Sequence, residues 1–270
     1  MVFVIAEAGV NHQGDPAIAA RLVKAAAVAG ANAVKFQTFD ADRLDPPGAR
    51  REALRELQLS YDAHISLSAY ARTCRIEFMS TPFDPDALRF LVEQVGVQRI
   101  KIASGQLDNE PLLRAARASG RRILLSTGMA GHAEIAAALE IVGTGRTTLL
   151  HCTSAYPCSA EDANLAALAR LRADFGGEVG FSDHTEGIEA ALAATALGAI
   201  VIEKHLTLDR GMEGPDHKAS IEPEEFCRMV VGIRRIESMM GDGDKRPRPC
   251  EAPARAVASE RRAWRERRAA

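Results

Sequence analysis

The sequence has 270 residues and a net charge of −2 at pH 7, and 47% of its residues are hydrophobic while 5% are aromatic. This length fits one large α/β domain or two small ones, with enough apolar residues for a substantial core. A charge so close to neutral gives no overall attraction to nucleic acid or to a membrane surface, so we expect neither as a partner. No apolar run approaches the roughly 20 residues that a membrane-spanning helix requires.

The cysteines are odd in number and lack the spacing of a metal finger: Cys74, Cys152, Cys158, Cys227 and Cys250. Reduced thiols in the cytoplasm are the simplest interpretation. The chain enters an apolar run at Val2, without the basic region and cleavage site of a signal peptide. We therefore expect a cytoplasmic protein.

Short apolar runs alternate along the chain with amphipathic, helix-like segments. The expected strands are 2–6, 33–36, 77–79, 97–102, 122–125, 147–151, 179–181 and 199–203. The expected helices are 16–29, 50–57, 63–74, one opened by Asp84-Pro85, 110–119, 133–142, 163–173, 188–197 and 223–240. This alternation is typical of parallel strands joined by helices.

Eight such units match a (β/α)8 TIM barrel, whose usual size is about 250 residues. A doubly wound open sheet is the alternative, but it ordinarily has a G-x-G-x-x-G turn after its first strand, and the segment 7–14 lacks that spacing. We therefore predict a single barrel domain over residues 1–242. Residues 243–270 are rich in Pro and Arg, and we expect a linker remnant and a charged tail there, either a solvated helix end or a partner-binding arm.

Polar and charged side chains follow nearly every predicted strand, at the end where barrel enzymes gather their catalytic groups. They are Glu7, Lys35, Gln37, Ser80, Thr81, Lys101, Ser104, Ser126, Ser154, Tyr156, Ser182, His184, Glu203 and His205. Hydroxyl and backbone N–H groups supply directed donors and lysine supplies compact charge, so the set suits a phosphate or another oxyanion. A buried ion pair of the two lysines with Glu7 is an alternative role, and the two roles can coexist.

Two of the strand ends carry histidine. If the seventh and eighth strands are parallel neighbours, His184 and His205 project from one rim, close enough to share a metal ion. Two unrelated histidines, one of them merely hydrogen-bonded, are the alternative. Alternation along the strands places Ser182 with His184 and Glu203 with His205, so Lys204 points away and is expected to have a supporting or structural role.

Several longer motifs together resemble the sialic acid synthase family. They occur in the family's order from the first strand to about residue 242, and they are IAEAGVNHQG (5–14), VKFQT (34–38), STPFD (80–84), KIASG (101–105), LSTGM (125–129), HCTSAYP (151–157), SDHT (182–185), EKH (203–205) and GPD (214–216). Each motif alone is weak, but the ordered series is specific to the family.

The resemblance implies a TIM-barrel transferase of carbohydrate biosynthesis. It would condense phosphoenolpyruvate with a sugar-type aldehyde, N-acetylmannosamine or a related hexosamine, to give a nonulosonic (sialic-type) acid and phosphate. The implied catalytic residues are Glu7, His184 and His205, and the two histidines would also bind a divalent metal, Mn²⁺ first, with Mg²⁺ or Co²⁺ as alternatives. By the same resemblance phosphoenolpyruvate would be held by Lys35, Thr81, Lys101, Ser104, Ser126, Ser154 and Ser182, and the acceptor by Gln37, Tyr156 and Asp216.

Two departures from the family concern the acceptor. The family normally carries a C-terminal domain resembling antifreeze proteins, which covers the partner's active site in a swapped dimer, whereas here the linker 244–249 is followed by an Arg/Ala-rich tail. The segment 39–60 is also shorter than in the family. We therefore expect a homodimer or a separate lid-domain protein as partner, and an acceptor smaller or less acylated than N-acetylmannosamine.

Two other functions remain open from the sequence. A Schiff-base aldolase would use Lys35, Lys101 or Lys204 as its nucleophile. A barrel that has lost its chemistry would serve as a binding or scaffold protein. The metal-dependent synthase is favoured, because lysines among anion-binding hydroxyls stay charged whereas a lysine nucleophile must be neutral.

Overall fold

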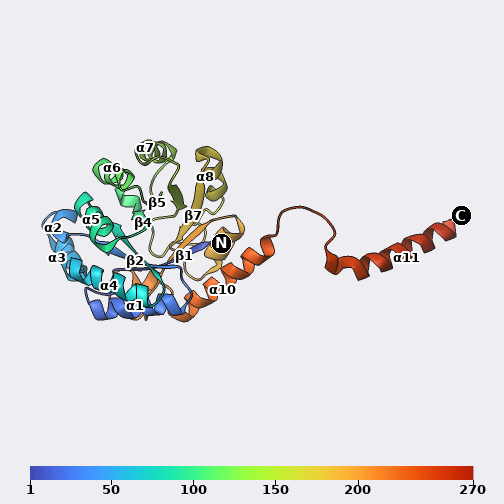
Figure 1. The fold of residues 1–270 in the computed structure, drawn as a ribbon, viewed down its shortest axis with the longest axis horizontal. Coiled ribbons are helices and arrows are strands. Elements are labelled where there is room, and N and C mark those ends of the chain that lie inside the picture. The colour runs from blue at the N-terminus through green and yellow to red at the C-terminus, as the bar shows by residue number, and fades with distance from the viewer. Residues whose placement is uncertain (270) are drawn as a thin grey trace. The chain divides into compact units, whose positions relative to one another are not determined.

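The structure, a computed structural model, describes residues 1–269 and divides into a unit from Met1 to Glu237 and a second that begins at Ser238. In the first unit, strands lie at the centre and helices surround them (Figure 1). The strands form one sheet in the order β3-β2-β1-β8-β7-β6-β5-β4, and hydrogen-bonded neighbours are parallel. Strands β3 and β4, at the ends of this order, also contact each other, so the sheet is the nearly closed (β/α)8 barrel that the sequence predicted.

The barrel strands are β1 (Phe3–Gly9), β2 (Ala33–Thr38), β3 (Glu77–Pro82), β4 (Arg99–Ile102), β5 (Arg122–Ser126), β6 (Thr147–His151), β7 (Glu178–Asp183) and β8 (Val201–His205). The α-helices are α1 (Pro16–Val28), α2 (Ala41–Leu44), α3 (Ala49–Leu57), α4 (Tyr61–Thr73), α5 (Pro85–Phe90), α6 (Glu110–Ala118), α7 (His132–Val142), α8 (Ala167–Phe175), α9 (Glu189–Ala196), α10 (Pro223–Met240) and α11 (Ala252–Ala269). A π-helical turn, η1 (Leu91–Val95), follows α5. Among the described residues, no helix is long and apolar enough to cross a membrane.

Side-chain caps explain where several helices begin. The carboxylate of Asp15 accepts a hydrogen bond from the backbone N–H of Ala17, and Pro16 occupies the first turn of α1. Asp84 accepts from the N–H of Ala87 at 2.8 Å in the same way, ahead of Pro85 in α5. An aspartate followed by proline satisfies an otherwise unpaired N–H and presets the helical φ angle, which is why this pattern predicts a helix start.

The barrel interior is layered along its axis. A middle layer is apolar and buried, and it consists of Ile5, Ala33, Met79, Leu124, Leu150 and Val201. Below it, at the N-terminal ends of the strands, Arg99 pairs with Glu77 and its guanidinium lies 4.1 Å from the ring centroid of Phe3. Above it lie the polar side chains of the strand ends. The apolar layer therefore separates two polar layers and forms the floor of the site described below.

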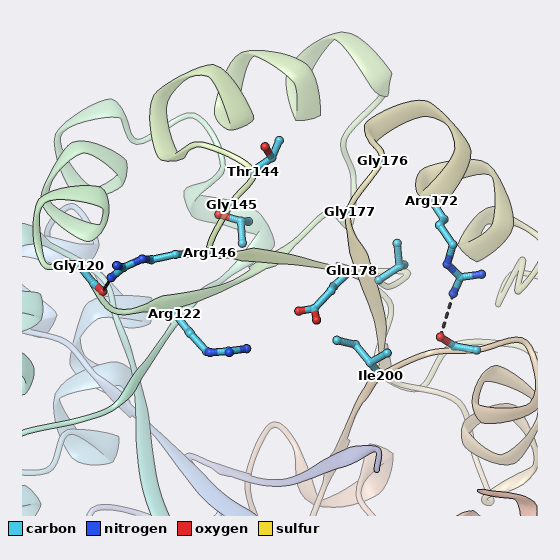
Figure 2. Close-up of a pocket in the computed structure, with 13 residues that line it drawn as sticks. Gly120, Arg122, Thr144, Gly145, Arg146, Arg172, Gly176, Gly177, Glu178 and Ile200 are labelled. Atoms are coloured by element: carbon cyan, nitrogen blue, oxygen red, sulfur yellow. Dashed lines mark hydrogen bonds between the residues drawn. The ribbon is translucent and has the colours of Figure 1, made fainter.

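A cavity of about 860 Å³ opens at the N-terminal ends of β5 to β8 and is lined by arginines (Figure 2). Two of these arginines hydrogen-bond to backbone carbonyls in the loops that follow neighbouring helices. Arg146 donates to the carbonyl of Gly120 after α6, and Arg172 donates to that of Gly198, at 2.8 Å, after α9. Helix C-termini carry partial negative charge, so a guanidinium group is favourable beside each of them and here also holds the loop that follows the helix.

Two local predictions differ from the structure. The helix expected over 163–173 begins only at Ala167, because His151 Nε2 hydrogen-bonds to the carbonyl of Ala163 and Thr153 donates to that of Asp162, which holds this segment in a turn. The short helix α2, capped by Asp40, was not predicted. The tail, expected as either a solvated helix end or a partner-binding arm, contains an 18-residue helix, α11, whose side chains are almost all exposed.

Candidate active site

A cavity of about 410 Å³ lies at the C-terminal ends of the strands, where the sequence predicted the site. It brings together every residue assigned to the site from the sequence: Glu7, Lys35, Gln37, Thr81, Lys101, Ser104, Ser126, Ser154, Tyr156, Ser182, His184, His205 and Asp216. These residues come from all eight strands or the loops that follow them. The chain thus gathers residues up to 209 positions apart in sequence, from Glu7 to Asp216, into one cavity.

Two lysines and two carboxylates form the charged centre of the cavity. Lys35 Nζ lies 2.6 Å from Glu7 Oε2 and 3.5 Å from Glu203 Oε2, and it donates to Thr81 Oγ1 at 2.9 Å. Lys101 Nζ lies 3.3 Å from Glu203 Oε1. The pairing of Lys35 with Glu7 is the one considered from the sequence, whereas Lys101 has Glu203, and not Glu7, as its direct partner.

Burial and the neighbouring charges shift the pKa values of the two carboxylates in opposite directions. Burial raises the pKa of Glu7 to about 7, although Lys35 opposes the rise. Burial would also raise the pKa of Glu203, but Lys101 and Lys35 outweigh it and lower that pKa to about 2. The carboxylates of Glu203 and Glu7 raise the pKa of Lys35 against the effect of its burial. At neutral pH Glu203 is therefore ionised, Lys35 is protonated and Glu7 is close to its midpoint.

Hydroxyl groups surround the lysines. Ser182 donates to Glu203 Oε1 at 2.8 Å, and Ser104 Oγ accepts from the backbone N–H of Gly128 at 2.9 Å. The hydroxyl of Ser126 is buried and has no hydrogen-bond partner among the described residues. A Cβ atom on Gly128 would lie 2.3 Å from Ser154 Oγ, so only glycine lets these hydroxyls converge. Unpaired donors beside two lysines suit the oxygens of an anionic ligand.

The two histidines face each other across the cavity. Their ring centroids are 5.7 Å apart, and His184 Nδ1 lies 2.6 Å from the carbonyl oxygen of Thr153. This contact places the proton on Nδ1, so Nε2 carries a lone pair, with Ser182 Oγ 3.4 Å away. His205 Nδ1 is buried without a hydrogen-bond partner, and its nearest carboxylate oxygen, Oδ2 of Asp216, is 3.8 Å away.

Burial lowers the pKa of both imidazoles, that of His184 to about 4 and that of His205 to about 3. Both are neutral at physiological pH, which is the form that ligates metals. The described residues contain no cluster of three or more His, Cys, Asp or Glu side chains that could hold a metal ion. The two neutral imidazoles, with ring centroids 5.7 Å apart, supply nitrogen donors of the kind that bind divalent ions.

The predicted acceptor-binding residues lie on the outer side of the histidines. The ring of Tyr156 is 4.2 Å from that of His184 and is half exposed at the mouth. A Cβ atom at Gly9, whose φ is +51°, would lie 3.0 Å from Asp216 Oδ2 and 3.3 Å from Glu7 Oε1. The lack of a side chain at Gly9 therefore lets the carboxylates of Asp216 and Glu7 lie close to the same stretch of backbone.

Some residues of the cavity were not assigned from the sequence. Glu203 was listed among the strand-end residues but was given no role, although strand alternation placed it on the same face as His205. Phe83, Cys152 and Met129 also line the cavity. Lys204 is fully buried outside it and bonds to Asp183 at 2.9 Å, so its expected supporting position is correct and its candidacy as a Schiff-base nucleophile in this cavity is wrong.

Comparison with known proteins identifies relatives of this chain. The NeuB family model matches residues 22–245. The N,N'-diacetyllegionaminic acid synthase of Legionella pneumophila is 43% identical, over 94% of this chain and 78% of its own length. The N-acetylneuraminate-9-phosphate synthase of Homo sapiens is 36% identical, over 92% of this chain and 74% of its own length.

A solved structure extends the likeness to the fold. The N-acetylneuraminic acid (sialic acid) synthetase from Leptospira borgpetersenii, in complex with citrate, has a TM-score of 0.90 and 38% identity, and the match covers 96% of this chain and 91% of that one. The family model spans most of the chain, and the relatives exceed 30% identity over most of their own lengths. The chain therefore belongs to the NeuB family, as its resemblance to the sialic acid synthases predicted.

Proposed function

We propose that this protein condenses phosphoenolpyruvate with an N-acylated amino-sugar aldehyde, in a reaction that depends on a divalent metal held by His184 and His205. Membership of the family makes it a phosphoenolpyruvate-dependent synthase acting on a sugar-type substrate. The finer proposal is carried by one observation: a lysine and hydroxyl cradle adjoins two neutral histidines in a single cavity. All five cysteines are free thiols, so the proposal places the reaction in the reducing cytoplasm.

The reaction joins C3 of phosphoenolpyruvate to the aldehyde carbon, adds water at C2 and releases phosphate by cleavage of the C2–O bond. Lys35 and Lys101 would offset the charge of the phosphate and carboxylate groups, as fixed cations do in phosphoryl sites. Thr81, Ser104, Ser126 and Ser154 would donate to the remaining oxygens, and Ser182 would join them by turning its hydroxyl away from Glu203. Among these, the unpaired hydroxyl of Ser126 has an unused donor ready for such a ligand.

A divalent ion would be held by His184 Nε2 and by His205, and when bound it supplies Lewis-acid polarisation of the aldehyde oxygen. The protein's own part is to orient the ligands. His184 is fixed by its bond to the carbonyl of Thr153, and His205 by burial among β1, β8 and the loop that holds Asp216. Mn²⁺ is the first expectation, with Mg²⁺ or Co²⁺ as alternatives.

Glu7 would handle the proton of the water that adds at C2. Its pKa of about 7 lets it accept a proton in one step and return it in another at neutral pH. Lys35, 2.6 Å away, favours the carboxylate form and so keeps part of the population competent as a base. The proposal therefore assigns Glu7 an acid–base role and Lys35 a role in binding the anion.

The acceptor would lie between Gln37, Tyr156 and Asp216, above the phosphoenolpyruvate. An N-acylated amino sugar is favoured over the smaller, non-acylated aldehyde because the relatives are named for N-acetylated and N,N'-diacetylated products. Turnover of N-acylated and free amino sugars of one configuration would decide between them. A clear preference for the non-acylated sugar would overturn this part of the proposal.

The decisive experiment measures phosphate release from phosphoenolpyruvate with metal-stripped protein, with and without added Mn²⁺. We expect release only with both Mn²⁺ and an acceptor, and we expect the His205→Ala variant to lose it. Full turnover by His205→Ala at limiting Mn²⁺ would overturn the metal assignment. Covalent trapping of pyruvate by borohydride on Lys35 or Lys101 would instead support the Schiff-base aldolase.

A further inference from the structure

Lys204 lies between two residues of the site but on the opposite side of the barrel wall. Its side chain and that of Asp183 are both completely buried. Lys204 Nζ donates to Asp183 Oδ2 at 2.9 Å and also to the carbonyl oxygen of Thr185. Asp183 Oδ1 in turn accepts from the N–H and the hydroxyl of Thr185, at 2.9 and 2.7 Å. We call these three residues the β7–β8 clamp.

The clamp lies where the backbone pairing of β7 with β8 ends. The last paired residues are Asp183 and Lys204, and the next residue on each strand is a histidine, His184 or His205. In a parallel pair the last bridge is completed by the N–H of the next residue on one strand, so the pairing of β7 with β8 reaches one of these histidines and goes no further. The clamp extends the link by two residues on the β7 side, because Lys204 bonds beyond His184 to the carbonyl of Thr185.

Stability alone is a weak explanation for such a pair. Burying two charges costs several kcal/mol of desolvation, and an apolar pair of similar volume often stabilises a fold as well or better. A charged pair with fixed hydrogen bonds has another property, which is that it specifies one geometry. Here that geometry concerns the two residues that flank His184 and the residue that precedes His205.

We propose that the β7–β8 clamp sets the spacing of His184 and His205 for a divalent ion, which makes Lys204, Asp183 and Thr185 positioning residues of the metal site. The inference rests on the metal binding in the proposed function. None of the three residues lines the cavity. They act through the backbone of the turn that carries His184, so they affect metal affinity without touching metal or substrate.

The test is a titration of metal-stripped protein with Mn²⁺, followed by electron paramagnetic resonance of the free ion. We expect Lys204→Met and Thr185→Val to weaken Mn²⁺ binding by about 10- to 100-fold, the range seen when groups that support metal ligands are removed. Thr185→Ser keeps the hydroxyl and should restore the affinity. At saturating Mn²⁺ the apparent KM for phosphoenolpyruvate should be unchanged in all three variants.

Thr195→Val is a matched control, because it removes another buried threonine hydroxyl, bonded to the carbonyl of Ala191 within α9. It should lower the melting temperature without weakening Mn²⁺ binding. The inference is overturned if Thr185→Val folds and binds Mn²⁺ like the wild type. If Lys204→Met fails to fold, the comparison of Mn²⁺ binding by Thr185→Val and Thr185→Ser still tests the inference. Wild-type protein that binds no Mn²⁺ would refute the metal half of the proposed function before any variant is compared, and the inference with it.

Discussion

Glu7 and Lys35 form a buried ion pair at the ends of neighbouring strands, with the carboxylate Oε2 2.6 Å from the lysine Nζ. Each side chain is about 3% exposed. A second carboxylate, Glu203, lies on the other side of the lysine at 3.5 Å. Lys35 interacts with two carboxylates, and its attraction does not fully stabilise the ionised form of Glu7. The effect of burial is therefore larger, and the pKa of Glu7 rises to about 7. The contact between Glu7 and Lys35 thus joins a carboxyl group suited to acid–base chemistry to a cation suited to binding an anion.

Replacing Glu7 by Gln should lower kcat by about 10²- to 10⁴-fold, the usual contribution of a general acid–base group, and change the KM for phosphoenolpyruvate much less. In the wild type, kcat/KM should fall as the pH drops below about 7, because Glu7 then takes up the proton it must be free to accept. The variant should lack this acidic limb. Glu178→Gln, at the opposite end of the barrel, is the control. An acidic limb of unchanged midpoint in Glu7→Gln would contradict the assignment.

Lys101→Ala should raise the KM for phosphoenolpyruvate by about 10- to 100-fold, since a hydrogen bond to a charged group contributes roughly 1.5–3 kcal/mol. Its loss also leaves Glu203 with one cationic partner, which adds repulsion toward the ligand. Initial rates at varied phosphoenolpyruvate measure the effect. Lys24→Ala, an exposed lysine on α1, should leave KM unchanged. Equal KM values for Lys101→Ala and the wild type would remove Lys101 from the site.

Gly128→Ala should abolish binding of phosphoenolpyruvate while the fold is retained. The added methyl group would meet Ser154 Oγ at 2.3 Å and Ser104 Oγ at 2.9 Å, so both hydroxyls must leave the cavity. Calorimetric titration with phosphoenolpyruvate measures the loss. Gly145→Ala is the matched control, because its methyl group would have no neighbour within 4 Å. Normal binding by Gly128→Ala would mean that these two serines do not hold the ligand.

His12 makes the fold sensitive to acid. Burial lowers its pKa from 6.5 to about 4, so the unfolded chain binds more protons and stability falls as the pH drops through this interval. A shift of this size corresponds to about 3 kcal/mol. In His12→Asn, which keeps an acceptor for the N–H of Gly14, the loss of unfolding free energy between pH 7.5 and 4.5 should be about 2–3 kcal/mol smaller than in the wild type. Urea unfolding at the two pH values checks this, and equal losses would refute it.

Most of the site was predictable because the C-terminal ends of all strands of a barrel lie at the same rim. Each strand places its last inward residues at the same rim, so Lys35, Lys101 and His205 could be grouped without knowledge of any contact. Alternation along β8 likewise separated Lys204 from Glu203 and His205. These predictions need only the strand period and the parallel order, which a sequence carries directly.

The partners within the site were not predictable in the same way. Which lysine lies beside which carboxylate depends on strand stagger and rotamers, so the pairing of Lys101 with Glu203 appeared only in the structure. The start of α8 depends on His151 and Thr153 binding carbonyls about ten residues further along the chain. Such bonds between side chains and backbone compete with helix formation and leave no periodic signal.

The apolar layer of Ile5, Leu124 and Leu150, with its neighbours, closes the barrel beneath the site. The cavity opens at the end where Tyr156 is half exposed. Under the proposed reaction, the lysines that would hold phosphoenolpyruvate lie deeper than the residues that would hold the sugar. Phosphoenolpyruvate must then enter before the sugar, and phosphate must wait for the sugar acid to depart. The kinetics should therefore be ordered, with a fixed order of substrate binding and product release, because the barrel is closed beneath the site.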